Sequence, residues 1–165
     1  MTDLERITSY LHAQARKLSV PELVEKVRND SGQLREALLA VPSDRFSTKP
    51  APDEWSPNEV AAHIVTTSDL FGQAITEIVA GREPTATPLD VMTEGAVVRT
   101  GAEWWDLHEA NRERLFASVL AADPAAHLDR SIYHPIFGNL NWREALLFLR
   151  IHDLDHARQI QAATD

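Results

Sequence analysis

The fold and the chemistry of this chain centre on a segment near its C-terminus, residues 149–160, which reads LRIHDLDHARQI. If this segment is helical, His152 and His156 lie one turn apart on the same face. That face also carries apolar residues at helical spacing: Trp142, Ala145, Leu146, Leu149 and Ile160. Two imidazoles thus occupy a buried stripe, where an unpaired polar group costs about 1–3 kcal/mol. His152 and His156 could therefore be hydrogen-bonded core histidines or ligands of a shared metal ion.

Length and composition predict one domain that covers residues 1–165. The 25 acidic and 16 basic residues give a net charge of -9, which repels phosphate backbones and predicts no nucleic-acid partner. The chain has no cysteine, so a thiol used in its chemistry has to come from outside the chain. The N-terminus lacks the apolar core of a signal peptide, and no apolar run is long enough to span a bilayer. We therefore expect a cytoplasmic protein without membrane association.

Hydrophobic periodicity predicts an all-α chain with four main helices and one short extra helix. The short helix covers residues 3–17, within an N-terminal extension of residues 1–18. The main helices are expected at residues 20–40, 57–81, 101–122 and 142–163. Three of them begin with capping boxes: Ser19 with Glu22, Ser56 with Glu59 and Asn141 with Glu144. No segment alternates at period two for long enough to predict a strand, and residues 131–140 are expected to form a structured loop. Such a set of helices predicts a four-helix bundle.

His63 is the natural third ligand, because it interrupts the inner stripe of the helix at 57–81. Three neutral imidazoles suit zinc, nickel, iron or copper rather than magnesium or calcium. Three protein ligands also leave coordination positions open for water or substrate, as in catalytic zinc sites. A lone His63 would more often be a hydrogen-bonded core histidine, and the pair His152 and His156 is compatible with both interpretations.

Other polar residues are candidates for supporting roles. Gln159, Asp153 and Asp155 are available to orient the imidazole rings. His108 and Asn111 are candidates to line the pocket from the helix at 101–122, although the phase of that helix is ambiguous. Taken one by one, the four histidines outside the triad are more typical of surface or structural positions: His12, His108, His127 and His134. Residues 82–100 show no sustained period and have the length typical of a lid or a disordered segment.

The segment HDLDH has the histidine spacing of the H-E-x-x-H metalloproteases, with Asp153 in the place of the glutamate. Aspartate is one methylene shorter and reaches a metal-bound water poorly. The chain also ends shortly after His156, without room for a downstream ligand. We therefore reject the metalloprotease interpretation.

Three motifs in order resemble the DinB-like proteins, the DinB/YfiT superfamily of metalloenzymes. Residues 55–63, WSPNEVAAH, resemble their W-S-x-x-E-x-x-x-H segment. Residues 134–140, HPIFGNL, resemble their H-P-x-x-G-x-L turn, and residues 152–160, HDLDHARQI, resemble their H-x-x-x-H-x-x-Q-I helix. The resemblance covers about residues 20–163 and leaves the N-terminal helix outside.

The resemblance implies an up-down-down-up four-helix bundle whose metal triad is His63, His152 and His156. It implies a divalent metal (zinc, nickel or iron), a homodimer, and an external low-molecular-weight thiol such as mycothiol or bacillithiol. The leading hypothesis is a metal-dependent S-transferase or isomerase acting on a small-molecule substrate. Two alternatives stay open: a non-catalytic, stress-related metal-binding bundle and a metal-dependent hydrolase of a small substrate. Neither the catalytic residues nor the substrate follow from the sequence.

Overall fold

The helices begin where capping residues place them. The computed structural model describes residues 1–85 and 95–165, and these contain α1 (Asp3–Lys17), α2 (Val20–Ala40), α3 (Pro57–Val79), α4 (Gly101–Ala121) and α5 (Trp142–Ala162). The expected helices are confirmed, and only the C-terminal ends of α3, α4 and α5 come slightly earlier than expected. Each helix begins with a complete capping box, in which the cap side chain and the acidic residue three positions later satisfy each other's backbone N–H. The boxes of α1 and α4, at Thr2 and Thr100, add to the three expected ones.

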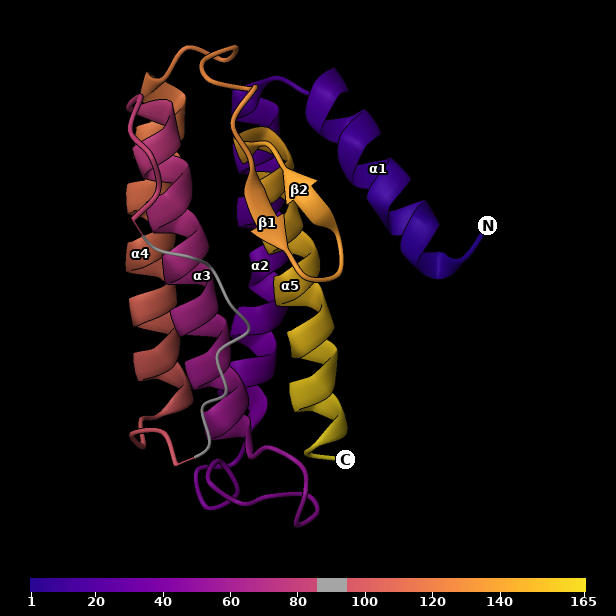
Figure 1. Ribbon diagram of the computed structural model, residues 1–165. Coiled ribbons are helices and arrows are strands. Elements are labelled where there is room, and N and C mark those ends of the chain that lie inside the picture. The colour runs from indigo at the N-terminus through magenta and orange to yellow at the C-terminus, as the bar shows by residue number, and fades with distance from the viewer. Residues whose placement is uncertain (86–94) are drawn as a thin grey trace.

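The predicted four-helix bundle is confirmed. In Figure 1, α3 and α4 run in one direction while α2 and α5 run in the other, which is the up-down-down-up arrangement. Each of α2 and α3 packs against both α4 and α5. Because α3 and α4 are consecutive and parallel, a crossover connects them. The lid expected at residues 82–100 lies partly outside the described residues, which resume at Gly95.

The apolar stripes of the helices form the core. Every apolar residue of the stripe expected on α5 is buried, including Trp142 and Ile160, each with 0% of its surface exposed. On α4 the structure resolves the ambiguous phase: His108 is 2% exposed, whereas Leu107 is 38% exposed. Arg112, one turn after His108, is also buried. The inner face of α4 is therefore more polar than its aliphatic residues suggested.

A polar clasp joins the starts of α3 and α4. The side-chain oxygen of Asn58 accepts hydrogen bonds from Trp104 Nε1 at 2.8 Å and from the backbone N–H of Arg99 at 3.1 Å. Its side-chain nitrogen donates to the carbonyl of Val97 at 3.1 Å. The clasp fixes the end of the crossover against the base of α3, close to the turn that carries His63.

The N-terminal helix α1 lies outside the bundle and packs on α5. Arg143 of α5 donates hydrogen bonds to the carbonyls of Ala15 and Leu18. Carbonyls at the end of a helix have no backbone N–H donor within the helix, so Arg143 supplies the missing donor. Leu11 is fully buried at this contact. The contacts make α1 an added layer over the helix that carries two of the candidate ligands.

The segment before α5 differs from the expected loop. It forms a small antiparallel hairpin, in which β1 (Ile132–His134) pairs with β2 (Gly138–Leu140). Strands of three residues are too short to show a period-two pattern, so the sequence could not predict them. Gly138 has a φ of 73°, the left-handed region that glycine adopts without strain. The hairpin turns His134 toward the bundle.

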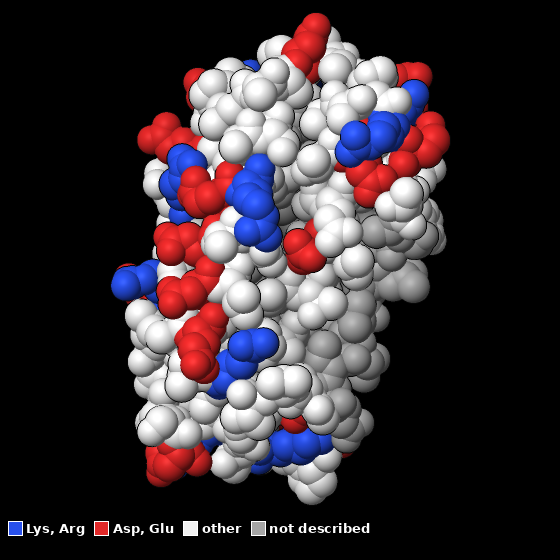
Figure 2. Space-filling model, turned by 90° about the vertical axis from the view of Figure 1, so that its left-hand side faces the viewer, with Lys and Arg blue, Asp and Glu red and all other residues white. Residues whose placement is uncertain are grey.

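The surface reflects the acidic composition. Figure 2 shows the side of the molecule on which α4 lies, where Lys and Arg side chains are scattered among Asp and Glu. Within residues 1–85 and 95–165, no helix combines the length and apolar character that crossing a membrane requires.

Candidate metal centre

The three predicted ligands lie together inside the bundle. His63 comes from α3, and His152 and His156 come from α5, with one ligand atom of each within 4.8 Å of the others. The Nε2 atoms of His63 and His152 are 3.4 Å apart. His63 is 4% exposed and His152 is 7% exposed, while His156 lies at the edge of the site and is half-buried. The bundle thus brings residues 89 positions apart in the chain into direct contact.

The spacing of these nitrogens fits a metal ion. Two imidazole nitrogens that each lie about 2.0–2.1 Å from a tetrahedral zinc ion are separated by about 3.3–3.4 Å. Without an ion, one of the two Nε2 atoms has to carry a proton, because otherwise the lone pairs of His63 Nε2 and His152 Nε2 would face each other. His152 Nδ1 has no hydrogen-bond partner among the described residues, so Nε2 is the nitrogen of this ring that faces the other two histidines. The donor set and the geometry therefore both fit an ion held by Nε2 atoms.

The protonation of the rings also suits metal binding. Burial lowers the pKa of His152 well below its usual value, and the neighbouring His156 and His63 lower it further. Burial likewise lowers the pKa of His156, although the hydrogen bond with Gln159 opposes this. Both rings are therefore neutral near pH 7 and do not have to lose a proton before they bind a metal.

Gln159 holds His156 in the required orientation. Its side-chain oxygen lies 2.7 Å from His156 Nδ1, which makes Nδ1 the donor and leaves Nε2 with a lone pair. The expected role of Gln159 as a partner of the triad is thus matched by its position. On the other side of the site, the ring of Trp55 lies 5.1 Å from that of His63, between centroids.

A cavity of about 910 Å³ opens in front of the triad. Its inner wall includes Phe137 and Phe148, and its outer part includes Ile136, which is 57% exposed, so the cavity reaches the surface. His134, expected to be a surface or structural residue, is buried and lines this cavity. Its Nδ1 accepts hydrogen bonds from the backbone N–H groups of Ile136 and Phe137 at 3.1 and 3.3 Å. Only the hairpin, which the sequence did not predict, gives His134 this position.

Asp153 does not support the triad as expected. Its carboxylate is fully buried and accepts two hydrogen bonds from Arg112 of α4, at 2.9 and 3.1 Å. His108 Nε2 lies 3.5 Å from the same carboxylate. Burial raises the pKa of Asp153, but Arg112 and His108 outweigh this and hold it below its usual range. Asp153 therefore belongs to a buried ion pair between α4 and α5, which fixes the rotation of α5.

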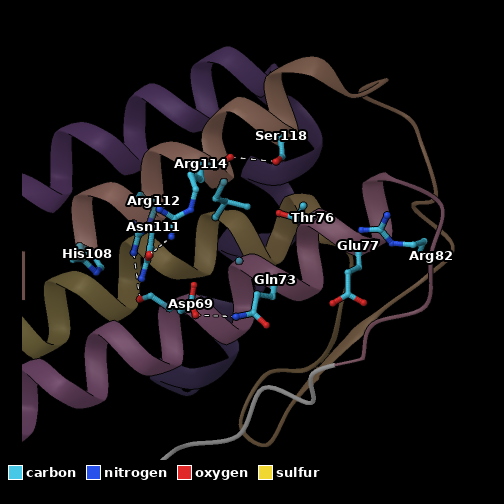
Figure 3. Close-up of a pocket in the computed structure, with 13 residues that line it drawn as sticks. Asp69, Gln73, Thr76, Glu77, Arg82, His108, Asn111, Arg112, Arg114 and Ser118 are labelled. Atoms are coloured by element: carbon cyan, nitrogen blue, oxygen red, sulfur yellow. Dashed lines mark hydrogen bonds between the residues drawn. The ribbon is translucent and has the colours of Figure 1, made fainter. Parts of the chain in front are cut away.

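His108 and Asn111, considered above as pocket residues, lie in a different cavity. It has a volume of about 400 Å³ and lies between α3 and α4, with Arg112 and His108 at its lining. Figure 3 shows Asp69 and Gln73 on α3 across from Asn111 and Arg112 on α4. Burial, and next the charge of Arg112, lower the pKa of His108. Neither His108 nor Asn111 lines the cavity that contains the triad.

Comparisons with known proteins place this chain in a family. A crystal structure described as that of TT2238, a four-helix bundle protein, is similar, with a TM-score of 0.64 and 20% sequence identity. The similarity covers 87% of this chain and 99% of that chain, and it supports the fold alone. No functionally curated protein matches the chain. The sequence model of the DinB superfamily matches residues 25–160, so the chain belongs to the DinB superfamily.

Proposed function

We propose that this protein is a divalent-metal-dependent enzyme that uses an external low-molecular-weight thiol in S-transfer or isomerisation. One observation carries the proposal: three imidazole nitrogens converge on the inner wall of a 910 Å³ cavity that reaches the surface. Membership of the DinB superfamily supports a metal at this site. Zinc, nickel and iron all accept three imidazoles, so the proposal covers all three metals.

The number of ligands favours catalysis over a structural role. Structural zinc sites use four protein ligands, whereas catalytic sites use three and keep one position open. Among the described residues, the triad is the single group of this kind and contains three histidines. A cavity of 910 Å³ is within the range of about 300–1,000 Å³ typical of sites for small molecules. A purely structural or sensing site needs neither an open position nor such a cavity.

Each element of the site has a distinct task in this proposal. His63, His152 and His156 would hold the metal, and Gln159 would keep His156 in the binding tautomer. A bound divalent ion would stabilise a thiolate at neutral pH. Phe137 and Phe148 would exclude water from the inner wall.

The transfer itself needs only the thiol and an electrophile. The thiol loses its proton to the buffer, and its sulfur forms a bond to the electrophilic carbon. The leaving group of that carbon departs with the electron pair of the broken bond. The chain contains no cysteine, so the sulfur nucleophile is external. Hydrolysis of a small substrate would use the same site with water in place of the thiol.

Metal content is the first test. Untagged protein should contain close to one equivalent of a divalent transition metal, or bind one equivalent of added Co²⁺. His63→Ala and His152→Ala should reduce the bound metal at least tenfold. His127→Asn is the matched control, because His127 lies outside the triad and its φ of 52° is one that asparagine tolerates. If wild-type protein binds no divalent metal, the proposed function is wrong.

Turnover assays separate the enzymatic schemes. Metal-loaded protein should conjugate an electrophile such as 1-chloro-2,4-dinitrobenzene with a small thiol, and His63→Ala should abolish the reaction. Ester hydrolysis without a thiol would instead favour the hydrolase. Stoichiometric metal binding without turnover of a panel of thiols and electrophiles would favour a non-catalytic bundle.

A further inference from the structure

The mouth of the metal-centre cavity carries acidic side chains. Asp53 and Glu54, from the loop before α3, and Asp155, on α5, are exposed and line the cavity. No lysine or arginine is among the described residues that line it. Lys49, in the same loop as Asp53, lies 3.9 Å from Glu59 Oε2 and does not line the cavity. The charged side chains at the mouth of the cavity are therefore all acidic.

The deeper wall has little charge of its own. Apart from the imidazoles and the amide of Gln159, its side chains are aromatic or aliphatic: Ile7, Trp55, Phe137, Phe148 and Ile151. Ile7 comes from α1, so the added N-terminal helix contributes to this wall.

From this distribution we infer that the cavity selects its thiol by charge: it takes an uncharged thiol and discriminates against one that bears a carboxylate. The inference rests on the proposed function and names the class of its thiol. A thiol bound by its sulfur at the triad extends the rest of its body toward Asp53, Glu54 and Asp155. A carboxylate on that body meets like charges at the mouth, whereas hydroxyl groups or a sugar meet hydrogen-bond acceptors.

The direct test uses the Co²⁺-loaded full-length protein and two small thiols, 2-mercaptoethanol and 3-mercaptopropionate. Thiolate binding to Co²⁺ gives a charge-transfer absorption band, which measures affinity without turnover. In the variant Asp53→Asn/Glu54→Gln, affinity for 3-mercaptopropionate should rise roughly three- to tenfold, because two like charges are removed. Affinity for 2-mercaptoethanol should stay within about twofold, and raising the salt concentration should narrow the difference between the proteins.

A matched control removes two acidic charges elsewhere. Glu36→Gln/Asp106→Asn changes exposed residues of α2 and α4 that do not line the cavity. It should leave both affinities unchanged. An equal gain for 3-mercaptopropionate in this control, or no gain in Asp53→Asn/Glu54→Gln, overturns the inference.

A second measurement is independent of the metal. Trp55 lines the cavity and is partly exposed, whereas Trp104, Trp105 and Trp142 are 7%, 8% and 0% exposed, so Trp55 dominates collisional quenching of fluorescence. Iodide is an anion and acrylamide is uncharged, so iodide should quench the fluorescence of the metal-free wild type weakly relative to acrylamide. Asp53→Asn/Glu54→Gln should raise the quenching constant of iodide about twofold or more. If the protein binds no metal, the proposed function fails, and an unchanged iodide constant then also refutes the acidic mouth.

Discussion

Replacing Arg112 by Met leaves the carboxylate of Asp153 buried without its main counter-ion. In the wild type, the Arg112 guanidinium contacts both carboxylate oxygens, at 2.9 and 3.1 Å. Arg112 is 4% exposed and Asp153 is fully buried, so the carboxylate depends on Arg112 for its charge compensation. His108, whose pKa is lowered by burial and by Arg112, supplies no compensating positive charge in the wild type at pH 7.

The expected loss of stability is large. Removing one partner of a buried ion pair costs about 3–5 kcal/mol, and a domain has a total stability of about 5–15 kcal/mol. With a urea m-value of about 1–3 kcal/mol/M, the midpoint of unfolding should fall by about 1–5 M. Because Asp153 directly follows His152 on α5, part of the lost order should also reach the triad.

Urea unfolding followed by far-UV circular dichroism measures this loss. Arg114→Met is the matched control, since Arg114 is an exposed arginine of the same helix and contacts Asn111 rather than Asp153. It should change the free energy of unfolding by no more than about 0.5 kcal/mol. The double variant Arg112→Met/Asp153→Leu replaces both charges by apolar groups and should recover most of the lost stability.

The pH dependence gives a further signature. Arg112 and His108 hold the pKa of Asp153 below its usual range in spite of burial, so this pair stabilises the fold above about pH 4 and less below it. In Arg112→Met, burial acts without Arg112 and raises the pKa, so Asp153 takes up a proton on acidification. The difference in free energy of unfolding between the wild type and Arg112→Met should therefore be smaller at pH 5 than at pH 7. A urea midpoint equal to that of Arg114→Met, or a double variant as unstable as the single one, would refute the reasoning.

Three further perturbations test the site and the packing. Gln159→Ala removes the acceptor of His156 Nδ1 and should weaken metal binding about 10- to 100-fold in a competition titration, whereas the exposed Gln161→Ala should not change it. Burial lowers the pKa values of His152 and His156, so the metal-free protein should lose stability as the pH falls below about 6.5. A variant with Ala at both positions should show a smaller drop in the urea midpoint over the same pH range. An equal drop would contradict the assignment of this pH dependence to the two histidines. A Cβ at Gly101 would lie 2.2 Å from the Leu38 carbonyl oxygen, so Gly101→Ala should lower the free energy of unfolding by about 1–3 kcal/mol in a thermal unfolding assay. A Cβ at Gly32 would have no atom within 4 Å, so Gly32→Ala should raise the free energy of unfolding by about 0.5–1 kcal/mol in the same assay.

The sequence by itself determined the helices. Their starts follow from local capping chemistry, as at Ser56 and Asn141, and their buried faces follow from a period that each segment carries on its own. The same local pattern singled out His63, His152 and His156, because a polar residue within an apolar stripe is visible without knowledge of the fold.

Other features depend on partners that are distant in the chain, and only the tertiary structure decided them. From the sequence, Asp153 could equally be a partner of the triad, because it directly follows His152. In the structure its carboxylate instead pairs with Arg112 of α4, which lies 41 residues away in the chain. His134 reaches the cavity only because of a hairpin whose strands are three residues long.

The acidic mouth of the cavity likewise joins Asp53 and Glu54 to Asp155, about a hundred positions later in the chain. Capping and periodicity act within a few residues, so they fix elements and their faces. Which polar groups meet across those faces depends on how the helices pack, and no local pattern records it.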